Sequence, residues 1–392
     1  MSDLALVLNA GSSSLKFSLF ETDAAAAIVL RVGGQVEGIG VKPRFVAKDA
    51  SGQVLVDLAY DPGAGHRGAM QRLVGWLGEH LGGRTVAVVG HRVVHGGTRY
   101  AQPVLVDGHV MEDLEALIPL APLHQPHNLK AIEAVALAYP GVPQVACFDT
   151  AFHRGQPWVA DTFALPREFH AEGLRRYGFH GLSYEYIAQQ LTTLSPRLAE
   201  GRVVVCHLGN GASCCAIRAG RSVDSTMGFT ALDGLPMGTR CGQIDPGVLL
   251  HLLEARGMTV AALGDLLYKE SGLEGLSGIS SDMRDLAASD RAEAAEAIAY
   301  FTFRIRREVA ALAASLEGLD GLVFTAGIGE HAASLRADVC RHLGWLGVEL
   351  DELANDASAD VVSMPASAVE VRVIPTNEEK MIAKHALGTI NT

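Results

Sequence analysis

The sequence predicts an α/β protein of two domains. Three observations support this prediction: the length of 392 residues, the alternation of apolar strand-like runs with helix-like segments, and a strand–turn–strand unit that occurs twice. A chain of this length exceeds what one hydrophobic core usually serves, so two domains are expected. Hydrophobic residues make up 48% and charged residues 19%, which is typical of a globular protein and not of a disordered chain.

The repeated unit is a pair of apolar runs joined by a glycine-rich turn. Residues 4–8 and 15–20 flank the first turn, and residues 203–207 and 212–217 flank the second. Each arrangement predicts two strands joined by a tight turn. Gly11 and Gly211 are 200 residues apart, one in each half of the chain, so the sequence indicates a loose internal repeat.

The remaining elements alternate between strand and helix, as in α/β architecture. Further strands are expected at residues 85–89, 144–148, 322–324 and 369–374. Helices are expected at residues 126–138, 183–191, 246–256, 292–316 and 334–343. The helix at 246–256 has the strongest end signals, with Pro246 at its start and Gly257 after it. Glycine- and proline-dense segments at 232–247 and 271–281 are expected to be ordered loops over a site.

Composition argues against several classes of protein. The net charge is -12 and no basic stripe is visible, so no nucleic-acid partner is expected. The start of the chain lacks a secretory pattern, and the apolar runs are too short to span a bilayer, so no membrane partner is expected. Six cysteines occur without a CxxC pair or zinc spacing, and Cys147 and Cys206 fit buried free thiols. A reduced, cytoplasmic setting is therefore expected.

Three glycine-rich turns follow strand-like runs, at Asn9–Lys16, His207–Gly211 and Gly327–His331. Glycine and small hydroxyl residues allow backbone N–H groups to approach a phosphate, and Lys16 adds a positive charge. The P-loop pattern is absent, and the third turn lacks the last glycine of a dinucleotide fingerprint. Each turn alone could be an ordinary loop, but three of them favour phosphate or nucleotide binding.

Two arginines stand between glycines. Arg92 lies within 90–97 and Arg240 within 238–242. A guanidinium in a glycine-flanked loop suits a bidentate clamp on a carboxylate or phosphoryl group, although a structural salt bridge is the alternative. His91 and His95 are four residues apart, but no HExxH pattern is present, so zinc is not expected.

Three further residues complete the inventory. Asp149 ends an apolar strand, which is a common active-site position in α/β proteins. His180 stands beside two glycines and is either functional or structural. Glu378 begins the last helix, where an acidic residue stabilises the helix N-terminus or holds Mg²⁺. Glycine turns, arginines and carboxylates suit phosphoryl transfer, which needs positioning and charge neutralisation more than covalent chemistry.

The sequence resembles the acetate kinase family along nearly its whole length. The matching segments, in order, are 8–16, 90–97, 119–124, 148–153, 177–181, 207–213, 224–229, 237–242, 327–330 and 375–379. The resemblance implies the actin-like (ribonuclease H-like) ATPase fold of sugar kinases, actin and heat-shock chaperones, with two α/β domains and the nucleotide in the cleft between them. Residues 1–150 with helix 378–392 would form the domain for the acid and the metal, and residues 151–377 the nucleotide-binding domain.

The resemblance also implies an activity, cofactors and an assembly state. The activity is reversible transfer of the γ-phosphoryl group of ATP to acetate, giving ADP and acetyl phosphate. The cofactors are ATP or ADP and Mg²⁺, with Mn²⁺ as a substitute, and the partners are a small carboxylate substrate and a second copy in a homodimer.

The resemblance assigns roles to individual residues. Asn9 and Glu378 would support the metal. Arg92 would hold the acetate carboxylate, beside an apolar pocket of Val94, Leu123 and Phe179. Asp149 would be catalytic by orienting Arg240 or the waters of the metal, and His180 and Arg240 would neutralise the transition state. The nucleotide site would comprise Lys16, His207, Leu208, Gly209, Asn210, Gly211, Asp282, Met283, Arg284, Gly327, Ile328, Gly329, Glu330 and His331.

The sequence departs from the family pattern at Gln125, Leu182, Tyr184, Ala231 and His331. Ala231 stands where a proline often contributes to the apolar pocket, and its loss could enlarge that pocket. Because one methylene is worth only about 1–3 kcal/mol there, propionate or butyrate kinase stays an alternative. An actin- or chaperone-like binding module is the alternative of another class, but the length leaves no room for a chaperone's peptide-binding domain.

Overall fold

A computed structural model of the chain describes residues 4–11, 14–23, 27–60, 65–122 and 124–391. The chain forms two compact units, with residues 1–152 and 377–392 in unit 1 and residues 153–376 in unit 2. These bounds differ by one or two residues from the expected division. The assignment of one domain to the acid and the other to the nucleotide stays a prediction.

Unit 1 is built on an eight-stranded sheet in the order β5-β4-β3-β2-β1-β6-β8-β7. Its strands are β1 (Leu4–Ala10), β2 (Leu15–Thr22), β3 (Ile28–Glu37), β4 (Arg44–Asp49), β5 (Val54–Ala59), β6 (Val86–Val93), β7 (Val104–Leu105) and β8 (Gln144–Phe148). Strands β1 to β5 are joined in antiparallel order, whereas β1, β6 and β8 are parallel. The carboxyl ends of these three parallel strands therefore lie along one edge.

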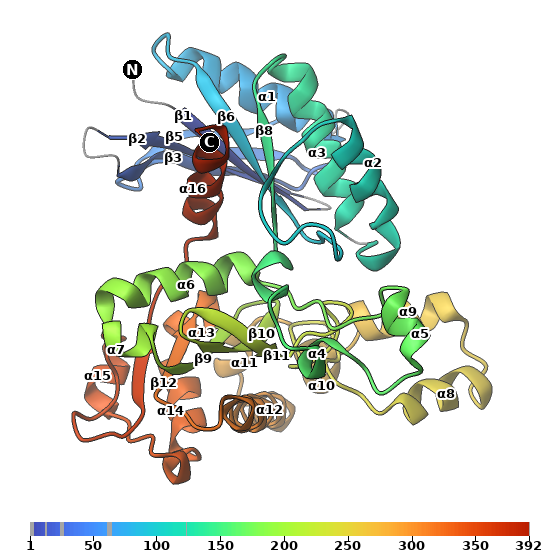
Figure 1. Ribbon diagram of the computed structural model, residues 1–392, viewed down its shortest axis with the longest axis vertical. Helices are drawn as coiled ribbons and strands as arrows, with labels where there is room; N and C mark the ends of the chain where they lie inside the picture. The colour runs from blue at the N-terminus through green and yellow to red at the C-terminus, as the bar shows by residue number, and fades with distance from the viewer. Residues whose placement is uncertain (1–3, 12–13, 24–26, 61–64, 123, 392) are drawn as a thin grey trace. The chain divides into compact units, whose positions relative to one another are not determined.

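Helices cover both faces of this sheet (Figure 1). They are α1 (Gly65–His80), α2 (Gly108–Ala116), the short 3-10 helix η2 (Ile118–Leu120), α3 (Gln125–Ala138) and α16 (Glu378–Ile390). Side chains cap two of them: Asp107 accepts from Val110 N at the start of α2, and Asn377 accepts from Lys380 N at the start of α16. Helix α16 packs on β1, β6 and β8.

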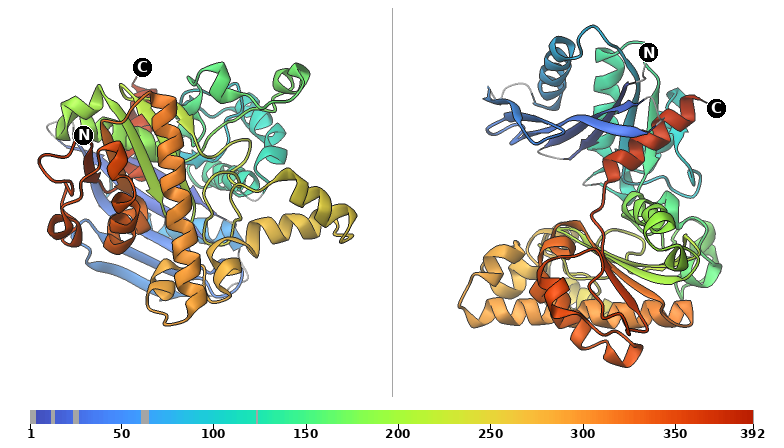
Figure 2. Two further views of the ribbon diagram at one scale, coloured as in Figure 1. Left: turned by 90° about the horizontal axis from the view of Figure 1, so that it is seen from below. Right: turned by 90° about the vertical axis from the view of Figure 1, so that its left-hand side faces the viewer.

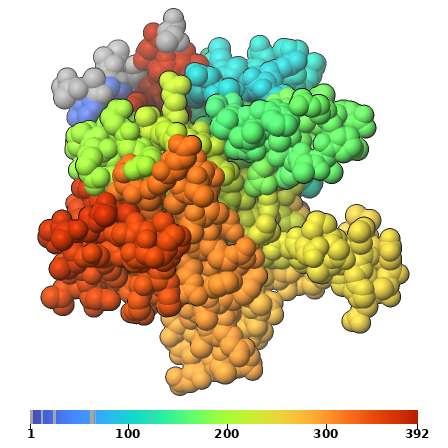
Figure 3. Space-filling model, turned by 60° about the horizontal axis from the view of Figure 1, so that its bottom comes forward, coloured from blue at the N-terminus to red at the C-terminus, as the bar shows by residue number. Residues whose placement is uncertain are grey.

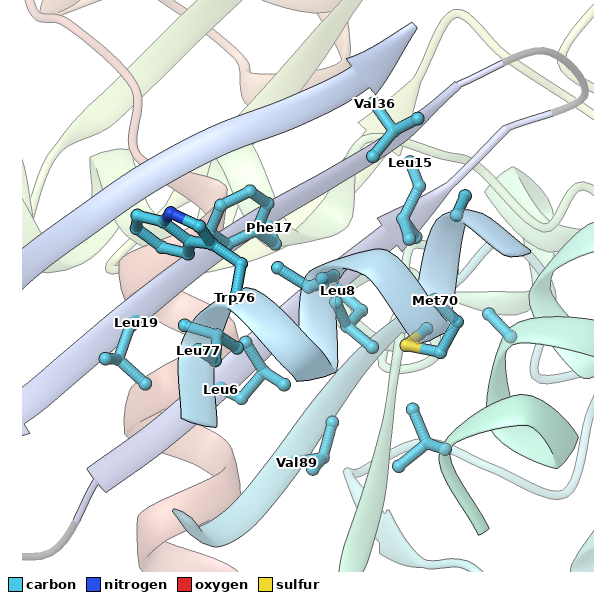
Figure 4. Close-up of a cluster of buried hydrophobic side chains, with 14 of the residues drawn as sticks. Leu6, Leu8, Leu15, Phe17, Leu19, Val36, Met70, Trp76, Leu77 and Val89 are labelled. Atoms are coloured by element: carbon cyan, nitrogen blue, oxygen red, sulfur yellow. The ribbon is translucent and has the colours of Figure 1, made fainter. Parts of the chain in front are cut away.

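The core of unit 1 lies between the sheet and α1. Alternate residues of β1, including Leu6 and Leu8, pack with Met70 and Leu77 of α1 (Figure 4). Aromatic rings extend this layer, because Phe45 stands 5.9 Å from Phe17 and 5.6 Å from Trp76 between ring centroids. Side chains at the intervening positions of β1 point to the other face, which α16 covers.

Unit 2 is built on a five-stranded sheet in the order β11-β10-β9-β12-β13. Its strands are β9 (Arg202–Leu208), β10 (Ala212–Arg218), β11 (Arg221–Ser225), β12 (Gly321–Thr325) and β13 (Glu370–Val373). Strands β9, β10 and β11 are antiparallel neighbours, and β9, β12 and β13 run parallel.

Unit 2 is rich in helices. They are α4 (Trp158–Asp161), α5 (Arg167–Ala171), α6 (Gly181–Leu194), α7 (Pro196–Ala199), α8 (Pro246–Glu254), α9 (Val260–Lys269), α10 (Gly272–Ser277), α11 (Met283–Ala287), α12 (Ala292–Leu316), α13 (Ala326–His331), α14 (Ala333–Arg341), α15 (Glu352–Asp356) and the 3-10 helix η4 (Gly344–Leu346), while η3 (Ala151–His153) spans the junction of the units. Helix α12 lies across one face of the sheet and α6 lies on the other (Figure 2). Helices α8 and α9 protrude from the rest of unit 2 (Figure 3, yellow).

The two sheets share one strand order. If β1, β2, β3, β6 and β8 are numbered 1 to 5, unit 1 contains the order 3-2-1-4-5. Strands β9 to β13 give the same order in unit 2, with antiparallel and parallel neighbours in the same places. The internal repeat expected from the two glycine turns is therefore present in the topology.

In both cases a helix that comes after the fifth strand packs in the other unit. After β8 the chain passes into unit 2, where α6 packs on β9. After β13 the chain passes into unit 1, where α16 packs on β1, β6 and β8. Unit 1 is consequently discontinuous in sequence, and unit 2 is continuous.

Most expected elements are present, with three corrections. Residues 326–329 are not a turn before a helix, because helix α13 begins directly at Ala326, whose φ is +65°. The segment 271–281 is not all loop, since it contains α10. Arg92 lies in strand β6 and not in a loop, because β6 continues four residues beyond the expected strand end at residue 89.

Two expectations about the chain's character can also be compared with the structure. All six cysteines have free thiols, and Cys147 and Cys206 are buried as expected. Of the helices in the described ranges, none combines the length and the apolar character needed to cross a bilayer.

Candidate active site

Unit 1 gathers five of the predicted site residues at one edge of its sheet. Asn9 is near the end of β1, Arg92 is near the end of β6, and Asp149 directly follows β8. The parallel pairing of β1 with β6 and of β6 with β8 makes these ends neighbours. Lys16 is paired with Asn9 across the first hairpin, and Glu378 begins α16, which packs on the same strands.

Arg92 and Asp149 form a bidentate ion pair. Arg92 Nε donates to Asp149 Oδ1 at 2.9 Å, and Arg92 Nη2 donates to Oδ2 at 2.7 Å. Asp149 is almost fully buried, whereas 21% of the Arg92 side chain is exposed. The pairing uses the Nε and Nη2 edge of the guanidinium, and Nη1 lies on its other side. Asp149 thereby fixes the direction in which Arg92 presents its charge.

Glu378 is the third charged group of this cluster. Its Oε2 lies 3.8 Å from Arg92 Nε. Burial raises the pKa of Glu378 to about 7, and the charges of Asp149 and Glu379 add to the rise, while Arg92 and Lys16 oppose it. Burial also opposes the charge of Arg92, but the Asp149 and Glu378 carboxylates outweigh this and raise the pKa of Arg92. The guanidinium is therefore a permanent cation between two carboxylates.

The chemistry of these donors fits a magnesium ion. Mg²⁺ prefers oxygen ligands and usually keeps several waters, with one or two carboxylates and substrate phosphates. Asn9 and Glu378 offer oxygens at this edge, and a cation beside Glu378 would stabilise its ionised form against the raised pKa. Within the described ranges no group of three His, Cys, Asp or Glu side chains could hold a metal, so a site made wholly of such residues is not found.

Gly90 brings α16 close to this edge. A methyl group at Gly90 would stand only 2.6 Å from Ile382 Cγ2, a distance that real contacts do not reach. The missing side chain therefore allows α16 to lie on β6. Glu378, at the first position of that helix, is placed near Arg92 as a result.

Asn128 is a positioning residue that the sequence reasoning did not identify. It is 2% exposed on α3, where its Oδ1 accepts from Val94 N at 3.1 Å and its Nδ2 donates to Ala10 O at 3.0 Å. It therefore links the ends of β1 and β6. Gln125, one of the departures from the family pattern, makes a similar link by donating to His95 O and Leu114 O.

Unit 2 places its second glycine turn between β9 and β10. Gly209 N donates to Gly211 O at 3.0 Å, which closes the turn, and Gly238 N donates to Asn210 O at 3.1 Å. A methyl group at Gly238 would stand 2.1 Å from Asn210 Oδ1 and 3.3 Å from Ser281 Cβ. The loop at 238 is therefore packed beside this turn, and so is Ser281, the residue before the 282–284 segment.

His180 and His207 form a stacked pair of rings. Their centroids are 4.2 Å apart with an interplanar angle of 23°. Hydroxyl groups hold both rings, because Ser213 Oγ lies 2.8 Å from His180 Nδ1 and Ser183 Oγ lies 2.8 Å from His207 Nδ1. His180 has a left-handed backbone conformation, with φ 57° and ψ 23°, at the start of α6. Such a conformation in a residue with a side chain is often found at functional sites.

Arg240 lies near the same turn as His180. Its Nη1 donates to Ala231 O at 3.0 Å and lies 3.5 Å from Met237 Sδ. A methyl group at Gly211 would stand 3.3 Å from His180 Nε2 and 3.9 Å from Arg240 Nη1. The structure therefore brings His180 and Arg240 together at Gly211, and Ala231 contributes its backbone oxygen to the position of Arg240.

Helix α13 carries the third glycine segment and lies beside the second. Thr325 pairs with His207 across β12 and β9, and a methyl group at Gly329 would stand 3.7 Å from Leu208 Cβ. Glu330 Oε1 accepts from Ala326 N at 2.8 Å and from Thr376 N at 3.1 Å, so this predicted nucleotide residue also has a structural role.

The far end of α13 is held by Arg336, which the sequence reasoning missed. Arg336 is completely buried and donates to the carbonyl oxygens of Gly329 and Glu330, both at 2.9 Å. It also donates to Asn355 and Ser358. Burial lowers its pKa, and the charges of Cys340 and Asp356 oppose this only in part.

Other predicted site residues are placed less closely. Asp282 caps its own helix and pairs with Arg284 at 2.5 Å, where the Arg284 side chain is 90% exposed and the Asp282 side chain is partly buried. Of the predicted apolar pocket, Val94 is buried in unit 1 and Phe179 in unit 2, whereas Leu123 lies outside the described residues. His331 is exposed. The nucleotide cleft expected from the resemblance stays a prediction.

Comparison with known proteins agrees with the resemblance. The family model described as the acetokinase family matches residues 4–384. An acetate kinase of Methylocella silvestris is 52% identical over 399 residues, which cover 100% of this chain and 99% of the relative.

Solved structures of the same kind superpose on nearly the whole chain. The acetate kinase of Porphyromonas gingivalis is 37% identical with a TM-score of 0.89, covering 99% of this chain and 100% of that one. A propionate kinase from Francisella tularensis is 36% identical with a TM-score of 0.92, covering 98% of this chain and 99% of that one. These likenesses confirm the two-domain actin-like α/β fold. The chain belongs to the acetokinase family.

Proposed function

We propose that this chain is an acetate kinase, which reversibly transfers the γ-phosphoryl group of ATP to acetate and gives ADP and acetyl phosphate. Its membership of the acetokinase family supports the proposal. The structural observation that carries it is the Asp149–Arg92–Glu378 cluster at the carboxyl ends of parallel strands. A fixed cation at such an edge, with one side of its guanidinium directed away from Asp149, is suited to receive a small carboxylate.

In this proposal Arg92 binds the carboxylate of acetate and Asp149 positions Arg92. Acetate arrives ionised at neutral pH, so no general base is needed to activate it. The observed partner of Asp149 is Arg92, which gives Asp149 a role besides the expected orientation of Arg240 or of metal-bound waters. Val94, Leu123 and Phe179 would line the methyl side of the substrate.

The metal would be held by Asn9 and Glu378. When bound, Mg²⁺, or Mn²⁺ in its place, neutralises phosphate charge and helps to orient the transferred group. Lys16, paired with Asn9 in the first hairpin, would add a positive charge for the nucleotide phosphates.

Unit 2 would hold ATP or ADP. The turn at 207–211 and helix α13 lie at the ends of neighbouring strands, and Ser281, which directly precedes the 282–284 segment, lies near Gly238 beside this turn. His180 and Arg240, which meet at Gly211, would place donors on the equatorial oxygens of the transferred phosphoryl group. Charge develops on these oxygens in the transition state, so donors fixed there contribute most to the rate.

A second acid is the specific alternative. The structural likeness to a propionate kinase and the small side chain of Ala231 favour tolerance of propionate. Acetate is the preferred substrate in the proposal, because 52% identity links the chain to an acetate kinase over its full length. Full-length membership of the acetokinase family argues against an actin- or chaperone-like binding module.

The resemblance also supports a homodimer and a cytoplasmic location. Light scattering of the purified protein tests the first, and fractionation of the source cells tests the second. A monomer at micromolar concentration would remove the homodimer from the proposal without affecting the reaction.

The decisive experiment traps acyl phosphate with hydroxylamine. Purified protein with ATP and Mg²⁺ is given acetate, propionate or butyrate in parallel, and the coloured hydroxamate complex is measured. Acetate is expected to give the highest kcat/KM, with propionate next. No product from any of the three acids would refute the proposal, and butyrate as the best substrate would refute the choice of acid.

A further inference from the structure

A buried hydroxyl chain leads from α6 to the His180 ring. Tyr184 and Ser213 are completely buried, and His180 is 9% exposed. The Tyr184 hydroxyl lies 2.5 Å from Ser213 Oγ, which in turn lies 2.8 Å from His180 Nδ1. The rings of His153 and His207 stand edge-on to Tyr184 at 5.7 Å and 6.4 Å, so the phenol is fixed in place.

The direction of these two hydrogen bonds follows from counting protons. Burial raises the pKa of Tyr184 well above its ordinary value, so the phenol keeps its proton. Ser213 Oγ is the hydrogen-bond partner of that hydroxyl within the described ranges. A buried O–H needs an acceptor, so Tyr184 donates to Ser213.

The Ser213 proton must then be donated elsewhere. Its remaining partner is His180 Nδ1. In the opposite arrangement Nδ1–H would donate to Ser213, Ser213 would donate to the phenol oxygen, and the Tyr184 proton would have no acceptor. The chain therefore runs from Tyr184 through Ser213 to a bare Nδ1, and the proton of the neutral ring is on Nε2.

The other ring nitrogen is directed at the second glycine turn. A methyl group at Gly211 would stand 3.3 Å from His180 Nε2 and 3.9 Å from Arg240 Nη1. His180 Nε2 and the Arg240 guanidinium therefore lie beside the same position next to Gly211, where an N–H on Nε2 would add a second donor. A ring with its proton on Nδ1 would present a lone pair there, which repels a phosphoryl oxygen.

We propose that Tyr184 and Ser213 are positioning residues that fix the His180 tautomer, so that Nε2–H is a permanent donor to the transferred phosphoryl group. This inference rests on the proposed function for the identity of the acceptor, but not for the tautomer itself. Tyr184 stands where the family resemblance predicts a histidine. A phenol has a single O–H, which it donates to Ser213, whereas an imidazole at this position could either donate to Ser213 or accept from it. The tyrosine therefore fixes the direction of the hydrogen bonds from residue 184 through Ser213 to His180.

The tautomer can be measured without substrate. In protein labelled with 15N in histidine, two-bond proton–nitrogen correlations distinguish bare from protonated ring nitrogens, and His180→Gln assigns the His180 signals. Wild type at pH 8 is expected to show a bare Nδ1 and a protonated Nε2. Ser213→Ala is expected to shift both nitrogens toward the average of two tautomers, Ser213→Thr to restore them, and Tyr184→Phe to give an intermediate result.

Tyr186→Phe is the matched control. Tyr186 lies on the same helix, outside the hydroxyl chain, and loses the same atom. Its variant is expected to leave the His180 signals and turnover unchanged. Tyr184→Phe is expected to lower kcat roughly tenfold, because a smaller fraction of the His180 rings then carries the proton on Nε2. KM for ATP and KM for the acid are expected to stay within about twofold.

The outcomes separate this inference from the proposed function. A wild-type ring with its proton on Nδ1, or wild-type signals in folded Ser213→Ala, would overturn the inference. Unchanged kcat in both Tyr184→Phe and Ser213→Ala would overturn the positioning role. A protein that makes no acyl phosphate but shows the expected signals would refute the proposed function and leave the tautomer assignment intact. If Ser213→Ala fails to fold, Tyr184→Phe and Ser213→Thr still decide the question.

Discussion

Units 1 and 2 share one strand order but carry different kinds of polar group at equivalent strand ends. In unit 1 the ends of β6 and β8 carry an ion pair, Arg92 with Asp149, and Glu378 lies close by. In unit 2 the ends of β9 and β12 carry His207 and Thr325, and hydroxyl groups hold the rings of His180 and His207. The shared topology therefore does not set the chemistry, which depends on the residues that follow each strand.

One enclosed arginine in each unit sharpens this contrast. Arg92, 21% of whose side chain is exposed, is compensated by the carboxylates of Asp149 and Glu378. Arg336, which is completely buried, is compensated by carbonyl, amide and hydroxyl oxygens that accept its hydrogen bonds and hold helix α13. The first arginine is paired with acidic side chains and the second with neutral oxygens.

The largest expected effect is the loss of the charge on Asp149. Asp149→Asn keeps the shape but frees Arg92 from its fixed direction, so kcat is expected to fall about 10³-fold in the hydroxamate assay. Asp161→Asn is the matched control in unit 2, because Asp161 is also a buried carboxylate, with Arg154, His170 and Arg175 around it. Its kcat is expected to stay near wild type.

The same variant distinguishes two roles of Asp149. If it acts through Arg92, KM for acetate rises and the Mg²⁺ dependence is unchanged. If it acts through metal-bound waters, the Mg²⁺ dependence shifts and KM for acetate is unchanged. Near-normal turnover with unaltered metal dependence would exclude both roles.

Removal of the supporting cation comes next. Arg336→Met leaves several buried oxygens without donors, so the free energy of unfolding is expected to fall by about 3 kcal/mol or more. KM for ATP is expected to rise while KM for acetate stays constant, because α13 is in the unit proposed to bind nucleotide. Arg341→Met, an exposed arginine on the same helix α14, should change neither urea stability nor KM. Equal effects of the two variants would contradict a supporting role for Arg336.

A smaller effect is expected on the free energy of unfolding at low pH, and it tests a property that the two units share. Burial lowers the pKa of His91 in unit 1 and of His153 in unit 2 to about 4 in each case. The unfolded chain binds protons at these groups near pH 6.5 and the folded chain does not. The stability that these two histidines contribute is therefore fully present above pH 6.5 and is lost as the pH drops toward 4.

His153→Gln isolates the contribution of unit 2. His153 Nδ1 lies 2.8 Å from Ser222 Oγ and Nε2 lies 2.9 Å from Phe179 O. The variant is expected to be less stable at pH 7.5 but to lose roughly 1–3 kcal/mol less than wild type between pH 6.5 and 4.5, measured by urea unfolding at each pH. The same slope in both proteins would show that His153 does not titrate as described.

The smallest expected effect concerns the choice of acid. Ala231→Pro restores the ring found in the family pattern without removing the backbone oxygen that holds Arg240. The ratio of kcat/KM for acetate over propionate is expected to rise by less than about tenfold, because a methylene in such a pocket is worth only ~1–3 kcal/mol. Ala292→Pro is the matched control, because Ala292 is the exposed first residue of α12 and proline is well tolerated at that position of a helix. A fall in the ratio would exclude Ala231 from the acid pocket.

The sequence predicted the elements with strong local signals. Helix α12 has the expected bounds, 292–316, because its long alanine-rich stretch ends before Gly318. The strands of both glycine hairpins were predicted for a similar reason, since apolar runs and glycines mark them. Strands β3 to β5 and helix α1 were not predicted, because β5 is mostly exposed and the segment lacks a clear apolar alternation.

The candidate site was predicted as a set of residues but not as a set of contacts. Arg92 and Asp149 are 57 positions apart, and the parallel pairing of β6 with β8 brings them together. No motif marks Asn128, Ser213 or Arg336 in the sequence. Each contacts residues that are distant along the chain. Patterns along the chain identify a glycine turn or a strand end, but they do not specify which distant side chain completes it.

The exchange of helices between the units has a consequence for synthesis of the protein. Unit 2 is continuous, so all of its residues leave the ribosome before α16 does. Unit 1 begins earlier but stays without the helix that carries Glu378 and covers β1, β6 and β8. During that interval the strands that α16 later covers are open on one face, and such surfaces attract chaperones or a second nascent chain. Completion of unit 1 is thus delayed until unit 2 has been made, and the Arg92–Asp149–Glu378 cluster forms only after α16 has been synthesised.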